Sequence, residues 1–312
     1  MNRRHFNKVA TSSVLGLTVL PGAFKLSEKM KNNMIRFGGP IFEKYTSPEE
    51  WVSAVKKKGY SAAYCPVQPG EKHDVVLAYK NAAARADIRI SEVGAWSNPI
   101  DPDEAKAKAA IEKCIRSLEL AEEIEAGCCV NISGSWNPES WDGPHKDNLT
   151  PETFDLIVET TRKIIDAVKP ERTFFTLEAM PWAYPDSVDS YLELIKAIDR
   201  KAFAVHLDPV NLINTPLKYY RNGELIKEAF QKLGKWIKNC HAKDTLINDT
   251  ELTLHISEAR PGLGILDYRT FITEAAKLDD VPLMLEHLEK EEDYDLAAAY
   301  VRSVGKELGM EF

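Results

Sequence analysis

From residue 35 onward the chain alternates between short apolar runs and longer stretches with the polar–apolar spacing of amphipathic helices. Each apolar run is continuous rather than alternating, which is typical of strands that are buried on both faces. The predicted strands cover residues 35–42, 61–67, 88–96, 128–133, 173–180, 203–210, 237–242 and 282–288. The predicted helices follow them in turn at residues 48–58, 75–86, 102–124, 151–168, 187–198, 223–233, 267–277 and 293–308.

Eight strands, each followed by a helix, predict an α/β fold, a single-domain (β/α)8 TIM barrel over residues 34–312. Ser47-Pro48 and Thr150-Pro151 are start signals for two of the helices. An open doubly wound sheet is the alternative, but it needs a glycine-rich phosphate turn after an early strand, and Gly38-Gly39-Pro40 does not make one.

Residues 134–150 form the longest stretch without a predicted element, directly after the fourth strand. This stretch carries Trp136 and His145. Because long loops in compact domains are often functional, we expect it either to cover a substrate or to be a plain surface insertion.

The first residues differ from the rest of the chain. Arg3-Arg4-His5-Phe6-Asn7-Lys8 precedes a mostly apolar run at 9–24, and this pattern resembles the twin-arginine export signal of bacteria. We therefore expect residues 1–30 to be a signal peptide with a short linker, read by the twin-arginine export machinery. The apolar run is too short to span a bilayer comfortably, and no cysteine follows it for lipidation. The prediction is a periplasmic or otherwise exported protein without a stable membrane anchor.

Charge excludes one class of partner. The net charge is −8, and no basic stripe follows the N-terminus, so nucleic acid is not an expected partner.

The cysteines give no sign of disulfides. Five cysteines at irregular spacing, without a Cys-x-x-Cys pair, predict buried structural side chains rather than disulfides or a thiolate metal site. The sequence leaves open whether the chain assembles into a homo-oligomer.

Charged or imidazole side chains end the last four predicted strands. These residues are Glu178, Asp208, His241 and Glu286. In a barrel, polar residues at the carboxyl ends of the strands face the catalytic mouth. Burying several carboxylates there is costly unless a cation compensates. The mostly oxygen donor set suits one divalent ion, Mn²⁺ or Mg²⁺ in the first place, with Co²⁺ or Zn²⁺ as alternatives.

The motifs around these residues resemble the xylose isomerase-like barrels that are called sugar phosphate isomerases/epimerases. The matching segments are LEAM at 177–180, LDPVNL at 207–212, HAKD at 241–244, RPGLGILDY at 260–268 and MLEH at 284–287. The resemblance implies that Glu178, Asp208, His241 and Glu286 are the metal ligands. It also implies that Glu178 and Glu286 serve as acid and base on opposite faces of a sugar.

One position departs from the pattern of that family. Many of its members carry histidine three residues after the Asp of the sixth strand, where this chain has Asn211. Asparagine can donate a hydrogen bond but cannot exchange a proton near neutral pH. His206 lies on the same side of the strand as Asp208. It either supplies the missing imidazole or lies one layer deeper.

The expected reaction is isomerisation or epimerisation of a free sugar, keto-sugar or sugar derivative. A metal-stabilised enediolate would form when Glu178 or Glu286 removes a proton next to a carbonyl. The candidate substrate-binding residues are His206, Asn211, Lys243, Arg260, Trp182, Trp136 and His145. Lys243 and Arg260 could equally form structural salt bridges, and the tryptophans could belong to the core or the rim.

Three other functions stay open. A lyase or dehydratase would use the same first step and then expel a group from the β carbon, for example on a 3-keto-glycoside, with His145 or His206 protonating the departing group. A non-catalytic sugar-binding barrel would share the fold without the chemistry. An apurinic-site endonuclease-like hydrolase would need a basic groove and a denser set of metal ligands, which this acidic chain does not offer.

Overall fold

The eight predicted strands form one parallel sheet in barrel order in the computed structural model, which describes residues 35–250 and 252–312. The predicted signal peptide at residues 1–30 lies outside the described residues. The sheet order is β3-β2-β1-β11-β8-β7-β6-β5-β4. The strands are β1 (Arg36–Gly38), β2 (Ala62–Ala63), β3 (Arg89–Ile90), β4 (Glu92–Gly94), β5 (Cys128–Asn131), β6 (Phe175–Glu178), β7 (Phe203–Leu207), β8 (Ile237–Ala242) and β11 (Pro282–Leu285).

The third predicted strand closes this sheet into a barrel. It is divided at Ser91 into β3, which pairs with β2, and β4, which pairs with β5. The two ends of the sheet order therefore belong to one continuous segment of chain. The single-domain (β/α)8 prediction for this part of the chain is confirmed.

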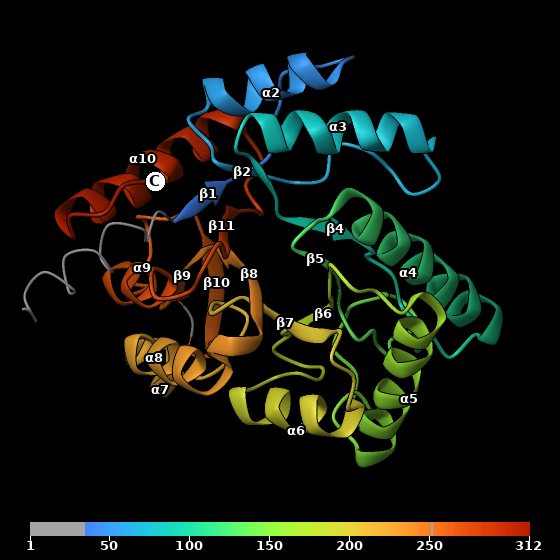
Figure 1. Ribbon diagram of the computed structural model, residues 1–312. Helices are drawn as coiled ribbons and strands as arrows, with labels where there is room; N and C mark the ends of the chain where they lie inside the picture. The colour runs from blue at the N-terminus through green and yellow to red at the C-terminus, as the bar shows by residue number, and fades with distance from the viewer. Residues whose placement is uncertain (1–34, 251) are drawn as a thin grey trace, which may run out of the picture. The chain divides into compact units, whose positions relative to one another are not determined.

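The helices surround the strands (Figure 1). They are α2 (Pro48–Lys57), α3 (His73–Arg85), α4 (Glu104–Ile124), α5 (Pro151–Val168), α6 (Val188–Ile198), α7 (Pro216–Tyr220), α8 (Asn222–Leu233), α9 (Tyr268–Ala275) and α10 (Glu291–Glu307), with the 3-10 turn η1 (Gly234–Trp236) after α8. The side chains of Ser47 and Thr150 cap α2 and α5 as the start signals predict. Among the described residues, no helix is long and apolar enough to cross a membrane.

A hairpin after the seventh barrel strand is absent from the predicted elements. Its strands β9 (Asp244–Asn248) and β10 (His255–Ala259) pair in antiparallel fashion. The Asp244 carboxylate accepts backbone N–H groups from Gly262 and Gly264, both at 3.0 Å, and so holds the segment that follows the hairpin. Most side chains of β9 and β10 are at least partly exposed, so the hairpin lacks the continuous apolar run that marks the barrel strands.

Candidate metal centre

Four side chains converge at the carboxyl ends of four neighbouring strands. Glu178 ends β6, Asp208 follows β7, His241 lies near the end of β8 and Glu286 follows β11. These strands are consecutive in the sheet order β11-β8-β7-β6. Each side chain offers one ligand atom, and these atoms all lie within 4.8 Å of one another. The predicted convergence is therefore present in the structure.

Ion pairs connect the four side chains to one another and to Lys243. His241 Nδ1 lies 3.0 Å from Glu178 Oε1 and 2.7 Å from Glu286 Oε1. Lys243 Nζ lies 2.8 Å from Asp208 Oδ2 and 3.0 Å from Glu286 Oε1. Asp208 and His241 are completely buried, whereas Glu178 and Glu286 line the cavity above them.

The donor set fits a divalent cation. Three carboxylates share this small volume with one ammonium and one imidazole, so negative groups are in excess. Asp208 Oδ2 and Glu286 Oε1 are buried without a well-oriented hydrogen bond, although both have cationic neighbours. Carboxylate oxygens and a single imidazole nitrogen are ligands that Mn²⁺, Mg²⁺ or Zn²⁺ accept. Glu178, Asp208, Glu286 and Nδ1 of His241 are the groups that would hold such an ion.

The buried charges shift one another's pKa. Burial raises the pKa of Asp208 to about 6, in spite of the ammonium of Lys243 beside it. Burial by itself would lower the pKa of His241, but Glu286, Glu178 and Glu92 raise it well above its ordinary value. For His241 the cause is the surrounding negative charge, whereas for Asp208 it is the loss of water on burial.

Further polar side chains lie against these four: Glu92, which also lines the cavity, and His206 and Asn239, which do not. Glu92 Oε2 lies 2.7 Å from His206 Nε2 and 3.4 Å from His241 Nε2, and it also accepts a hydrogen bond from Asn239. Glu92, His206 and Asn239 are almost or completely buried. His206 thus lies one layer deeper and does not line the cavity, which decides between its two expected places. Glu92 is placed to orient His241, as carboxylates commonly do for metal-binding histidines.

The cavity above the four side chains has a volume of about 1120 Å³. Asn211 and Trp182, both predicted as substrate-binding residues, line it. Asn211 Nδ2 donates to Glu178 Oε1 at 3.2 Å, and its Oδ1 accepts from Lys243 at 3.0 Å. Lys243 is only 2% exposed and lies within the charged cluster rather than on the cavity wall.

The structure does not bring three other candidates to the cavity. Arg260 faces Asp293, at 3.7 Å, and the indole N–H of Trp136 donates to Thr153 Oγ1 at 2.8 Å. His145 Nδ1 lies 3.7 Å from a carboxylate oxygen of Asp147. Arg260, Trp136 and His145 are absent from the cavity lining because each turns toward a partner in its own neighbourhood.

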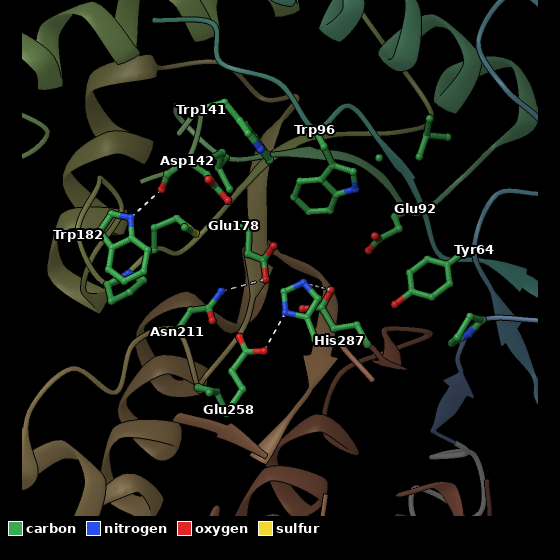
Figure 2. A pocket seen from close by; sticks show the side chains of 18 of the residues that line it. Tyr64, Glu92, Trp96, Trp141, Asp142, Glu178, Trp182, Asn211, Glu258 and His287 are labelled. Carbon is green, nitrogen blue, oxygen red and sulfur yellow. Dashed lines mark hydrogen bonds and ion pairs between the residues drawn. The ribbon is translucent and has the colours of Figure 1, made fainter. Parts of the chain in front are cut away.

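Sequence reasoning missed other polar residues that line the cavity: Tyr64, Glu92, Glu258 and His287. Glu258 lies on β10, and its Oε1 lies 3.0 Å from Lys243 Nζ. Its Oε2 lies 2.9 Å from His287 Nδ1 (Figure 2). A charge inside an apolar run was a usable signal for Glu92, and His287 directly follows Glu286. Glu258 gave no signal, because the hairpin that carries it was not predicted.

Comparisons with known proteins agree with this architecture. A family model described as xylose isomerase-like TIM barrel matches residues 52–304. A search of curated proteins finds no match.

Solved structures share the fold at low sequence identity. The probable 3-DHS dehydratase AsbF from Bacillus anthracis is 17% identical with a TM-score of 0.63, and the match covers 87% of this chain and 98% of that one. The 3-keto-D-glucoside 4-epimerase YcjR from E. coli is 14% identical with a TM-score of 0.61, covering 86% and 99%. A xylose isomerase-like TIM barrel protein from Mycobacterium smegmatis, in complex with magnesium, is 15% identical with a TM-score of 0.61, covering 88% and 95%.

The family match spans most of the chain, and the barrel closes as that family's name requires. This chain belongs to the xylose isomerase-like TIM barrel family.

Proposed function

We propose that this protein is a metal-dependent isomerase or epimerase that acts on a free sugar, keto-sugar or sugar derivative by moving a proton next to a carbonyl. One observation carries the proposal. Glu178 and Glu286 line the cavity, whereas Asp208 and His241, from the two strands between theirs, are buried beneath it. The same cluster thus offers carboxylates that reach a substrate and ligands that only hold an ion.

The chemistry follows from this division. A bound Mn²⁺ or Mg²⁺ would stabilise the negative charge that develops on a substrate oxygen when the neighbouring carbon loses its proton. One of the two glutamates removes that proton, and the other delivers a proton to the carbon. Asn211 holds the Glu178 carboxylate through its 3.2 Å hydrogen bond but cannot itself exchange a proton.

A lyase or dehydratase is the second candidate, and His287 favours it. Its Nε2 lies 3.6 Å from Glu286 Oε2, and its Nδ1 lies 2.9 Å from Glu258 Oε2. An imidazole held in this way in the cavity could protonate a departing group, which His145 and His206 are not placed to do. One structural neighbour is named as a probable dehydratase and another as an epimerase, so the shared fold is compatible with either outcome.

The decisive experiment is turnover of a panel of sugars, keto-sugars and glycosides in deuterated water. We expect solvent deuterium at one carbon of a responsive substrate, and a loss of about 10²–10⁴-fold in rate in E178Q and in E286Q. A product that differs from the substrate only by exchanged deuterium identifies an epimerase or isomerase. A product that has lost an aglycone or the elements of water identifies a lyase. Unchanged turnover in both variants would remove the mechanism.

Export remains a proposal that rests on residues 1–30. A fusion of this segment to a reporter, compared with the R3K/R4K form, tests whether the twin-arginine machinery carries the chain out of the cytoplasm.

A further inference from the structure

Three large indoles line the cavity that holds the carboxylates. Trp96, Trp141 and Trp182 are 36%, 41% and 38% exposed. They come from the segment after β4, the 134–150 stretch and the segment after β6. In Figure 2 Trp96 and Trp141 lie on the side of Glu178 away from Glu258, and Trp182 lies to one side of Glu178. The cavity therefore combines carboxylates and flat apolar surfaces in one lining.

The positions of these indoles are built into the fold. Gly94 makes room for Trp96, because a Cβ at Gly94 would collide with the indole nitrogen. The indole N–H of Trp182 donates to the backbone carbonyl of Asp142 at 2.7 Å, which ties this ring to the loop that carries Trp141.

The size of the cavity exceeds what one sugar ring needs. Its volume of about 1120 Å³ lies above the roughly 300–1,000 Å³ that is usual for pockets holding drug-sized ligands. The lining of this volume reaches from Glu178 and Glu286 to the three indoles. Apolar side chains add to the same lining, among them Met180, Ile213 and Ile256.

We propose that the substrate is a glycoside of two rings, whose reacting sugar lies at Glu178 and Glu286 while its second ring stacks on the wall formed by Trp96, Trp141 and Trp182. This inference rests on the proposed function, since it names the substrate of that same site. The second ring needs one flat apolar face, which both an aryl group and the C–H face of a sugar provide.

Binding to the metal-loaded protein tests this, measured by calorimetry in three matched series. The first sugar is glucose in one series, galactose in the second and xylose in the third. Within each series we compare the affinities of its methyl glycoside, its phenyl glycoside and a disaccharide that carries it. We expect a two-ring compound in at least one series to bind about tenfold or more tightly than its methyl partner. A preference for phenyl or for the disaccharide then tells an aryl group from a sugar.

Substitutions of the indoles test whether they cause the tighter binding of two-ring compounds. W141L should remove most of the two-ring advantage and change methyl glycoside binding less than about twofold. W182L should also remove most of the advantage, whatever its effect on the methyl glycoside. W236L is the matched control, because Trp236 lies in η1 and is absent from the cavity lining. Equal affinities of one-ring and two-ring compounds in every series, no binding by any two-ring compound, or an advantage that survives both substitutions would overturn the inference.

The proposed reaction and the proposed two-ring substrate can be refuted independently of each other. Binding needs no turnover, so a two-ring preference without deuterium exchange removes only the proposed chemistry. Deuterium exchange on a monosaccharide without a two-ring preference removes only the glycoside inference.

Discussion

The ammonium of Lys243 lies 2.8 Å from Oδ2 of Asp208, and both side chains are almost completely buried at the end of the barrel that carries the candidate metal centre. Burial by itself would lower the pKa of Lys243, but Asp208 and Glu286 raise it well above its ordinary value. The lysine is therefore a fixed positive charge within the carboxylate cluster.

Replacing Lys243 by methionine should show how much the lysine stabilises the buried carboxylates around it. We expect K243M without added metal to lose about 3–5 kcal/mol in free energy of unfolding, since carboxylates are left buried without their cation. Mn²⁺ should then raise the melting temperature of K243M more than that of the parent protein. K57M removes an exposed lysine that pairs with Glu43 and should change stability by less than about 0.5 kcal/mol. An equal response of K243M and the parent to Mn²⁺ would contradict this role.

Removing the metal should destabilise the protein. Because a ligand that binds only the folded state stabilises it by mass action, Mn²⁺ at one hundred times its dissociation constant should add about 2.7 kcal/mol relative to EDTA. D208N loses one of the four candidate ligands, so its response to Mn²⁺ should be much smaller. The melting temperature by differential scanning calorimetry checks both statements, and identical curves in EDTA and Mn²⁺ would argue against a metal centre.

Glu92 should act on the metal through His241, which it approaches at 3.4 Å. We expect E92Q to weaken Mn²⁺ binding by about 10–100-fold, because the carboxylate that orients the imidazole is lost. The affinity can be measured by competition with a chelator on samples whose circular dichroism shows an intact fold. E122Q, in α4, is the control that should leave the affinity unchanged. Equal affinities of E92Q and the parent protein would show that Glu92 has only a structural role.

Glu122 stabilises the chain before β6, and this contribution should depend on pH. Burial raises the pKa of Glu122, but backbone N–H groups of Arg172 and Glu171 and the Arg172 guanidinium outweigh it, so the pKa falls below its ordinary value of 4.5. The stabilisation is therefore complete above about pH 4.5 and is lost as the pH falls through the lower folded-state pKa.

The variant that tests this is E122Q. We expect it to lose about 1–3 kcal/mol at pH 7, since hydrogen bonds to a charged group are weakened, and to approach the parent protein at pH 3. Urea unfolding at several pH values measures the difference. E119Q, exposed on the same helix, should show no such convergence. A difference that stays constant down to pH 3 would exclude the carboxylate as its source.

The barrel itself could be predicted because each of its elements carries a local signal. A continuous apolar run such as Phe203–Leu207 marks a strand that is buried on both faces, and Ser47 and Thr150 mark helix starts. The residues that end neighbouring parallel strands must meet at one end of the barrel, so order along the chain was enough to bring together Glu178, Asp208, His241 and Glu286.

Only the tertiary structure decided what surrounds these four side chains. The pairing of Glu92 with His206 spans 114 positions in the chain, and the contact of Glu258 with His287 depends on a hairpin whose exposed strands lack an apolar run. The same holds for Arg260 and Trp136, which fit the candidate pattern but turn to other partners. Periodicity reports which face of an element is buried, whereas the direction of a polar side chain depends on the nearest partner that folding brings to it.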